Sequence, residues 1–529
     1  MEVGAHATPH WNRIQGKGAP FSRALALYLT DRLTLNINRA GRAVIGIRLS
    51  DLDVVIVGAG PAGLFAAYEL ATRSKGKLRI SLVEQGLDVT RRICPMNVLA
   101  ARGKKPVCVG CRPCHIMSGV GGAGALSSGT INLRPDIGGD LDKLVGSWER
   151  ANELVRYVDS VFVKFGAPNR LFVPDEEKSK ELERLAASAG ARFIPVAQRH
   201  MGTENTPMVI RAITDYLESA GVTLLTLTKV HDILKDGGSY SIITNRGELR
   251  SRYVVLAPGR SGADWFSELA RRRGIEVEPG PLDVGVRVET PSYVAEPVTS
   301  VVRDPKFIMY TKKYDDKVRT FCTNKEGYVV EEYYEDGTVG VNGESYATRG
   351  SRNTNFALLV TVKLTDPLED TIEYGRSIAR LATRLGGGRP ILQRLGDLEA
   401  GRRSTYSRIE RSLVEPTLKN FTAGDISMAY PYRIVDDLLD ALGRLDLVMP
   451  GVASPQTLLY APEIKYYSVR AKVNADLETT LEGVYAAGDG VGLSRGINGA
   501  AATGVLAAHG ILRKEGVEVG PNYNLVLEA

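Results

Sequence analysis

The stretch DVVIVGAGPAG, residues 53–63, decides the fold of this chain. Its first five residues form a short β-branched run, which is typical of a strand buried on both faces. A glycine-rich turn follows, and residues 65–74 then have helical spacing. In such a unit the glycines permit the sharp turn, let a pyrophosphate approach the backbone, and let helix and strand pack closely. The stretch predicts an α/β dinucleotide-binding fold, with its turn formed by Gly58, Ala59, Gly60, Pro61, Ala62 and Gly63.

A second predicted strand, RISLVEQ at residues 79–85, ends near Glu84, which comes 21 residues after Gly63. An acidic residue at this place in a dinucleotide fold can accept hydrogen bonds from the ribose hydroxyls of the adenosine half. The unpaired N–H groups at the start of the first helix, together with its dipole, would face the phosphates. Glu84 is therefore a predicted nucleotide contact.

Two distant segments indicate which dinucleotide binds. GVYAAGDGVGLSRGINGAAATG, residues 483–504, resembles the second flavin motif of the glutathione-reductase-like flavoprotein superfamily, and YVVLAPGRSG, residues 253–262, resembles its middle motif. The resemblance implies that the ligand is FAD, that Asp489 binds the ribitol chain, and that Gly499 lies at a helix start facing the flavin ring. It also implies FAD contacts from Gly122, Ala123, Val230, Gly259, Gly488 and Asn498.

Several phrases resemble one group of FAD-dependent dehydrogenases from archaea and bacteria, over roughly residues 51–515. They are CRPCHIMSGVGGAGALSSG, PLDVGVRVE, RTFCTN, VNGESY, NTNFALLV and GVYAAGDG. This resemblance implies an FAD-dependent oxidoreductase that passes a hydride or electrons between a small organic substrate and an electron carrier. No second G-x-G-x-x-G follows a predicted strand, so we expect NAD(P)H only as a diffusible reductant.

The length of 529 residues exceeds what one hydrophobic core usually supports. We expect a Rossmann-like FAD-binding domain built from discontinuous segments, with an inserted mixed α+β substrate domain. The FAD-binding domain is expected over residues 51–150, 203–265 and 451–518, and the substrate domain over residues 151–202 and 266–450. Residues 1–50 are expected to form a basic N-terminal extension, for which disorder is one possibility, and residues 519–529 a tail.

Four of the five cysteines lie in the segment 94–114, next to a glycine-rich loop at residues 119–129. The spacing of Cys94, Cys108, Cys111 and Cys114 has three interpretations: an iron–sulfur cluster, structural zinc, or no metal, with free thiols or a redox-active pair. In the superfamily the adjoining loop runs past the pyrophosphate to the flavin ring. The segment is thus a candidate entry or exit for electrons, or a cap that holds the loop in shape.

Two residues are candidates for catalysis. His200 precedes the helix predicted from residue 207, at an expected domain junction, where it could transfer a proton alongside a hydride. Arg287 lies on a predicted strand of the second domain and could hold an acidic substrate group. A hinge histidine and a structural salt bridge are the alternatives.

Charge and composition exclude some classes of function. The formal net charge is +6, and residues 1–50 carry seven Lys/Arg and two acidic residues, so the rest of the chain is close to neutral. A nucleic-acid partner is therefore not expected. No run of 18 apolar residues exists, so a membrane span is not expected either.

Few, clustered cysteines favour a reducing compartment, and we expect a cytoplasmic protein. Two other interpretations of the Arg-rich residues 1–50 are a targeting segment and a start codon assigned too far upstream. Two other function classes remain open at this point. One is an FAD-dependent RNA-modifying or RNA-binding protein, and the other is a non-catalytic flavin redox sensor.

Overall fold

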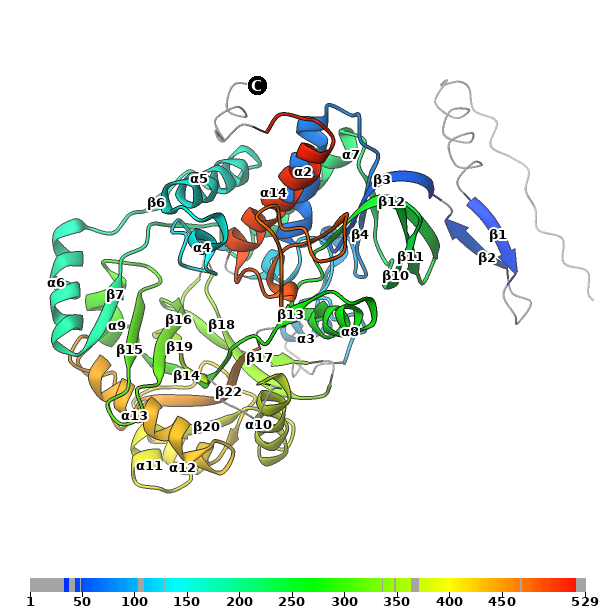
Figure 1. Cartoon of the computed structure of the whole chain (residues 1–529). Coiled ribbons are helices and arrows are strands. Elements are labelled where there is room, and N and C mark those ends of the chain that lie inside the picture. Colours follow the sequence, from blue (N-terminus) through cyan, green and yellow to red (C-terminus); the bar gives the residue numbers. More distant parts are fainter. Residues whose placement is uncertain are drawn as a thin grey trace, which may run out of the picture.

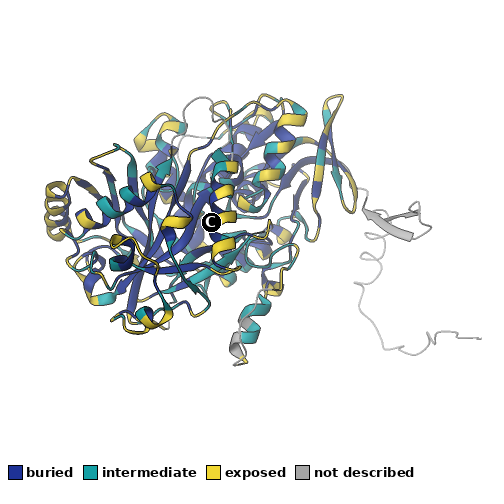
Figure 2. Cartoon of the chain, turned by 90° about the horizontal axis from the view of Figure 1, so that it is seen from below, coloured by how far each residue is buried: buried dark blue, intermediate teal, exposed yellow. Residues whose placement is uncertain are grey.

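The computed structural model describes residues 33–37, 43–47, 49–102, 109–127, 129–334, 336–346, 349–362, 371–466 and 469–519. Two domains lie side by side, each built around its own sheet (Figure 1). Figure 2 shows strands of both sheets in dark blue between helices whose outward faces are exposed. This layering follows from the sequence, because β-branched runs such as residues 54–57 are entirely buried.

The first domain contains a seven-stranded sheet in the order β10-β11-β12-β3-β4-β9, with β24 also pairing with β12. Strands β9, β4, β3, β12 and β24 run parallel, and β10, β11 and β12 form an antiparallel meander. The predicted α/β class is confirmed. The strands are β3 (Leu49–Val57), β4 (Ile80–Val83), β9 (Thr223–Leu225), β10 (Val230–Asp236), β11 (Ser239–Thr244), β12 (Gly247–Leu256) and β24 (Val484–Ala486).

Helices α2 (Pro61–Ser74) and α14 (Ile497–Lys514) cross in direct contact in this domain (Figure 1). A Cβ on Gly504 would lie 2.0 Å from the carbonyl oxygen of Ala62, so only a glycine permits this approach. The crossing joins the first and the last motif of the chain. The other helices of this domain are α3 (Pro95–Ala101), α4 (Leu141–Val145), α5 (Trp148–Lys164), α7 (Thr206–Ser219) and α8 (Ala263–Arg273).

The second domain contains an eight-stranded sheet in the order β21-β20-β22-β14-β19-β16-β15-β7. Its pairs are antiparallel except for β20 with β21. The strands are β7 (Ala191–Ile194), β14 (Leu282–Pro291), β15 (Lys306–Tyr310), β16 (Lys317–Asn324), β19 (Asn353–Val362), β20 (Ile391–Arg394), β21 (Thr422–Ala423) and β22 (Leu458–Tyr466).

Helices cover the second sheet and complete a mixed α+β domain. They are α6 (Glu176–Ser188), α9 (Ser292–Thr299), α10 (Thr371–Leu385), α11 (Leu395–Glu399), α12 (Tyr406–Glu410) and α13 (Tyr432–Leu445). Besides the two-stranded hairpin formed by residues 33–37 and 43–47, three small sheets complete the described structure. They are β5 (Thr130–Asn132), β8 (Gln198–His200) and β6 (Leu171–Phe172); β13 (Val277–Glu278) with β23 (Arg470–Ala471); and β17 (Tyr328–Tyr333) with β18 (Val339–Glu344).

The expected domain boundaries need two corrections. The boundary at residue 150 falls inside α5, whose buried side chains, such as Leu154 and Phe162, join the core of the first domain. The boundary at residue 450 falls before β22, which pairs with β14 and β20 in the second sheet. The apolar patterns of α5 and β22 fit either core, so the sequence alone did not assign them.

Part of the expected N-terminal extension is described. Strands β1 (Leu33–Ile37) and β2 (Ala43–Ile47) form an antiparallel hairpin, and β3 begins at Leu49. The other residues of the extension, and nearly all of the expected tail, lie outside the described residues.

Candidate functional site

The three predicted motifs meet at one edge of the first sheet. Gly58 follows β3, Glu84 follows β4, and residues 257–259 follow β12, while residues 487–489 follow β24. These strands are parallel, so their carboxyl ends lie together. In open α/β sheets this edge is where ligands bind.

Three glycines at this edge are required by close packing. A Cβ on Gly58 would lie 2.1 Å from the carbonyl oxygen of Ala257, and one on Gly63 would lie 1.8 Å from that of Gly58. A Cβ on Gly490 would lie 2.1 Å from the carbonyl oxygen of Gly259. Backbone contacts therefore join the first, middle and last motifs.

Other glycines of the same motifs face open space. A Cβ on Gly259 or Gly496 would meet no atom of the described residues within 4 Å, and one on Gly60 would meet only the Cα of Gly122, at 3.8 Å. Gly60 and Gly496 are the N-caps of α2 and α14, and neither helix has a side-chain cap among the described residues. The first N–H groups of both helices are therefore available to a ligand.

Glu84 is buried and is held by the backbone of the glycine turn. Its Oε2 accepts from the N–H of Ala59 at 3.0 Å, and its Oε1 accepts from the N–H of Gly86 at 2.8 Å. The backbone N–H of Thr228 also bonds to the carbonyl oxygen of Glu84, which brings the start of β10 and Val230 to the same corner. Each carboxylate oxygen keeps further acceptor capacity for a ligand hydroxyl.

Asp489 lies between the middle motif and α14. Its Oδ1 accepts from the hydroxyl of Ser494 at 2.9 Å, and its Oδ2 accepts from the N–H of Gly496 at 3.2 Å. Burial raises the pKa of this carboxyl above its ordinary value, although the positive charge of Arg260 opposes that rise. The preceding Gly488 packs against Ala62: a Cβ on Gly488 would lie 3.0 Å from the Cβ of Ala62, so this strand end also reaches α2.

The glycine-rich loop is clamped by Arg92, a residue that the sequence analysis missed. Its guanidinium donates to the carbonyl oxygens of Val120 at 2.8 Å and Gly122 at 2.7 Å. Further bonds go to the carbonyl oxygens of Ile116 and His115. Burial lowers the pKa of Arg92 to about 10, so it remains a cation at neutral pH. No sequence signal separated Arg92 from the other basic residues near the cysteines.

The clamped loop lies over the start of α2. The N–H of Gly121 donates to the carbonyl oxygen of Ala59 at 2.7 Å. Gly122 has a φ of 59° and caps the short 3-10 turn at Ala123–Leu126. The loop thus closes one side of the space next to Gly60 and places Ala123 beside it.

The cysteine segment is only partly described. Cys94, Cys111 and Cys114 are half-buried, and Cys108 lies outside the described residues. Among the residues that the structure describes, no group of three metal-ligating side chains is close enough to hold a metal ion. The four-cysteine metal site therefore stays a prediction. Cys114 does lie near enough to Arg92 for a thiolate there to raise the arginine pKa.

His200 lies on β8, the central strand of the small sheet between the domains. Its Nδ1 is 3.4 Å from the hydroxyl of Thr130, and its Nε2 is buried with no hydrogen-bond partner among the described residues. Burial lowers the pKa of His200 to about 4, and the positive charge of Arg303 adds to that shift. The imidazole is therefore neutral at physiological pH.

Strand β5 of the same small sheet contacts the start of α14. The side-chain amide of Asn498 donates to the carbonyl oxygen of Asn132 at 2.8 Å, while its Oδ1 is buried with no hydrogen-bond partner in the described part of the chain. Gly499 packs against Gly138, where a Cβ would lie 2.4 Å from the carbonyl oxygen. The α14 start and His200 thus belong to one connected region.

The prediction that Arg287 binds substrate is wrong for this structure. The side chain is fully buried, and its guanidinium forms a bidentate ion pair with Glu463, at 2.8 and 2.6 Å. Its remaining donors go to the carbonyl oxygen of Cys322 and to the side chains of Asn342 and Asn355. Every donor of Arg287 is used inside the second domain. Arg287 therefore forms a structural salt bridge, which was the alternative to substrate binding.

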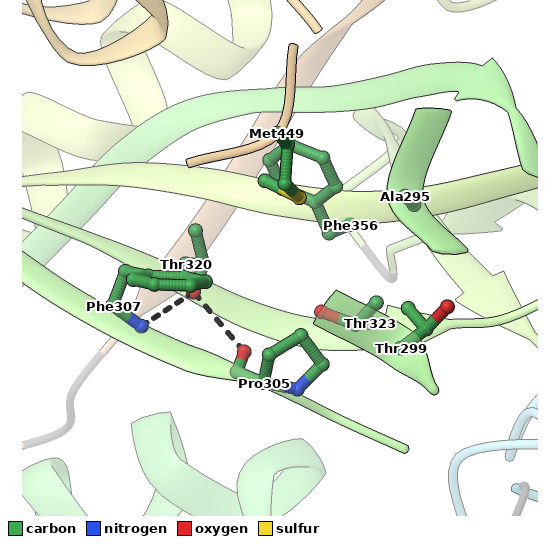
Figure 3. Close-up of a pocket in the computed structure, with 8 residues that line it drawn as sticks. All are labelled: Ala295, Thr299, Pro305, Phe307, Thr320, Thr323, Phe356 and Met449. Atoms are coloured by element: carbon green, nitrogen blue, oxygen red, sulfur yellow. Dashed lines mark hydrogen bonds between the residues drawn. The ribbon is translucent and has the colours of Figure 1, made fainter. Parts of the chain in front are cut away.

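A small pocket lies in the second domain, between α9, β15, β16 and β19. Figure 3 shows Phe307, Phe356 and Met449 among its lining side chains. The hydroxyl of Thr320 accepts from the N–H of Phe307 at 2.9 Å and donates to the carbonyl oxygen of Pro305 at 3.2 Å, so its hydrogen bonds are made internally. The pocket is apolar and contains none of the predicted site residues.

The comparison with protein families decides the class of this chain. Residues 53–90 match the family described as FAD binding domain, and residues 281–466 match the family described as FAD-dependent protein, C-terminal domain-like. The chain is an FAD-dependent oxidoreductase. The predicted cofactor FAD and the predicted enzyme class are thereby confirmed.

Relatives of this oxidoreductase include an uncharacterized protein of Clostridium beijerinckii, 27% identical over 485 residues, which cover 87% of this chain and 80% of the relative. Glycine oxidase of Geobacillus kaustophilus is 27% identical over 240 residues, which cover 44% of this chain and 59% of the relative. The solved structure of glycine oxidase from Geobacillus kaustophilus has a TM-score of 0.39 and 13% identity, and the match covers 91% of this chain and 99% of that one. L-proline dehydrogenase from P. horikoshii has a TM-score of 0.37 and 12% identity, covering 89% and 95%.

Within the described residues of the oxidoreductase, no helix is both long enough and apolar enough to cross a membrane.

Proposed function

We propose that FAD binds along the carboxyl ends of the parallel strands, from Glu84 at the adenosine ribose to Asp489 at the ribitol chain. The open positions at Gly60, Gly259 and Gly496 support this placement, because they mark unfilled space beside the first N–H groups of α2 and α14. Glu84 would accept from the ribose hydroxyls, and the N-terminus of α2 would hold the pyrophosphate.

The flavin end of the site is proposed to lie at the start of α14. The unpaired Oδ1 of Asn498 supports this, since buried polar atoms normally have a partner. The first N–H groups of α14 would stabilise negative charge on the ring. The clamped loop at Gly122 and Ala123 would exclude water from one side, because Arg92 fixes its backbone.

The proposed reaction is a dehydrogenation of a small organic substrate bound between the two domains. When bound, FAD supplies the acceptor for a hydride or electron pair. His200 is the proposed proton acceptor, at Nε2, because this atom is unpaired and the imidazole is neutral at physiological pH. A diffusible electron carrier would reoxidise the reduced FAD and complete the cycle. NAD(P)H would serve as the reductant only in the reverse direction, in which the substrate is reduced.

Two finer assignments accompany this proposal. The order of the three motifs supports membership of the glutathione-reductase-like superfamily and of its dehydrogenase group. A cytoplasmic location is supported by Cys111, Cys114 and Cys322, which form no disulfide with any described residue. The segment 94–114 remains the proposed place for a metal or a redox thiol, and metal and acid-labile sulfide analysis of protein purified without air tests this.

The observation that carries the proposal is the open space at Gly60, Gly259 and Gly496 beside two uncapped helix starts. The test measures the FAD dissociation constant of the apoprotein by flavin fluorescence for the wild type, Glu84→Gln and Asp489→Asn. We expect each variant to bind about tenfold or more weakly, since each places an amide where a carboxylate accepts hydrogen bonds. Glu482→Gln, an exposed change outside the site, is the control. Unchanged FAD affinity in both site variants would refute the placement.

A further inference from the structure

Two arginines near His200 form no ion pair with any residue that the structure describes. Arg303 and Arg170 lie over the ring of Phe172, with guanidinium carbons 5.3 and 4.9 Å from its centroid. Neither forms a hydrogen bond or an ion pair with any described residue, and Arg303 is only half-exposed. Burial lowers the pKa of Arg303, the charges of Asp304 and Glu326 oppose that shift, and the like charge of Arg170 adds to it. Two adjacent guanidinium groups repel each other, and a bound anion would relieve that repulsion.

Two acidic residues near these arginines bind other cations. Asp304 binds the ammonium group of Lys306 and accepts from the N–H of Thr323 at 2.7 Å. Asp159 forms a bidentate pair with Arg199, at 2.7 and 2.8 Å. A third acid, Glu326, attracts Arg303 electrostatically without an ion pair or hydrogen bond to it. Arg303 and Arg170 therefore have no ion-pair partner among the described residues.

His200 completes this group. In the antiparallel pair of β6 and β8, Leu171 lies opposite Arg199, so the next position places Arg170 opposite His200. On the other side of β8, Thr130 lies opposite His200. Paired residues of neighbouring strands lie on the same face of a sheet. His200 is 8% exposed and its Nε2 is unpartnered in the described structure, so a third donor lies beside the two guanidinium groups.

We propose that Arg303, Arg170 and His200 form a subsite for a carboxylate group of the substrate. Planar guanidinium groups match a carboxylate with two parallel hydrogen bonds. In the tautomer whose Nδ1 accepts from Thr130, the Nε2–H of His200 donates to the same carboxylate. The substrate class is therefore an organic acid. In this complex the Nε2–H of His200 is bound to the carboxylate, so the deeper assignment gives His200 a substrate-positioning role in place of proton transfer at Nε2.

The subsite lies close to the proposed flavin end. Asn132, which bonds to Asn498 at the start of α14, pairs with Gln198, two residues before His200 on the same strand. Two strand residues span about 7 Å. A small organic acid held by Arg303 could therefore reach the flavin ring, and this deeper assignment rests on the proposed function.

The experiment uses the holoprotein and isothermal titration calorimetry with acetate and benzoate as probes. Acetamide and benzamide are the uncharged controls, and inorganic phosphate tests the other common oxyanion. We expect saturable binding of at least one carboxylate, no binding of the amides, and weaker binding of phosphate. Arg303→Gln should weaken carboxylate binding about tenfold or more, and Arg303→Lys less.

The control variant is Arg433→Gln. Arg433 also lies over an aromatic ring, that of Tyr314, but it pairs with Asp316 on the surface of the second domain. Flavin absorbance and thermal unfolding of every variant separate loss of the subsite from loss of FAD or of the fold. Holoprotein that binds FAD but neither carboxylate, or that binds phosphate more tightly, overturns the subsite while leaving the proposed function standing. Protein without FAD instead refutes the proposed function.

Discussion

A Cβ on Gly490 would lie 2.1 Å from the carbonyl oxygen of Gly259 and 2.7 Å from its carbonyl carbon. The two glycines are far apart in the sequence, and they bring the middle and last motifs into backbone contact. Because the obstacle is main chain, no side-chain rotation can relieve it. This contact positions Asp489 relative to the end of β12.

We expect Gly490→Ala to weaken FAD binding and to lower the free energy of unfolding by about 1–3 kcal/mol, as overpacking does in a tight core. The measurements are bound flavin per protein and urea denaturation. Gly443→Ala is the matched control. Gly443 lies in α13, where a Cβ meets no described atom within 4 Å, and the change should be neutral or slightly stabilising. Equal FAD content in both variants would contradict the argument.

Arg92→Met removes the clamp on the glycine-rich loop. The carbonyl oxygens of Val120 and Gly122 lose their guanidinium donors, and each unsatisfied buried group costs about 1–3 kcal/mol. We expect a lower melting temperature and weaker FAD binding, measured by flavin release on heating. Arg91 is the exposed neighbour of Arg92, and the control variant Arg91→Met should melt and bind FAD like the wild type. An Arg92→Met protein that retains its flavin normally would show that the loop holds its shape without the clamp.

Arg287→Met leaves Glu463 buried without its main partner. We expect the free energy of unfolding to fall by about 3–5 kcal/mol, as when one member of a buried ion pair is removed. The double variant Arg287→Met with Glu463→Gln should lose less than the sum of the single changes, because the pair is coupled. A large loss of turnover at unchanged stability would instead favour a catalytic role for Arg287.

Glu69 makes the stability of the first domain depend on pH. Burial acts to raise its pKa, but the hydrogen bond and charge of His509, together with the charge of Arg73, hold the pKa below the ordinary value of 4.5. A carboxyl with a lowered folded-state pKa stabilises the fold above the unfolded pKa, and this contribution is lost as pH falls through the folded value. The free energy of unfolding should therefore decline below about pH 4.5.

Urea denaturation between about pH 6 and about pH 3 measures this effect. Glu69→Gln should lower the free energy of unfolding near pH 6, and the free energy of this variant should fall less steeply than that of the wild type as the pH is lowered. Glu415→Gln removes an exposed carboxyl that pairs with Lys419 and should change little, because surface pairs contribute little. Parallel curves for wild type and Glu69→Gln would show that other carboxyls control acid unfolding.

Local pattern was enough to predict several elements of the site. The buried run before Gly58, the glycine turn and the acid after β4 are features of adjacent residues, and the structure places Gly58 and Glu84 at the same sheet edge. Asp489 was assigned by resemblance, and the packing of Gly488 on Ala62 brings it to that edge. The roles of these residues toward FAD stay predictions.

Other features could not be predicted, because they depend on contacts between distant segments. No sequence pattern distinguishes Arg92 or Arg287 from other arginines of the chain. Arg92 binds the backbone of the glycine-rich loop, and Arg287 forms a buried ion pair with Glu463. Arg303 stands apart because it forms no ion pair with a described residue while the nearby Asp304 binds Lys306, and this is visible only once the partners are located. Strand β22 pairs with β14 and β20 in the second sheet, and no pattern in its own residues predicts these partners.

The class of fold follows from the sequence, because strand period and glycine turns are local properties that a short stretch specifies. The cofactor was implied by the resemblance of motifs spread along the chain. The folded chain was needed to show which charges are paired and which glycines are packed or open. Pairing and packing depend on residues brought together from far along the chain, and their energies arise only when those residues share a buried environment.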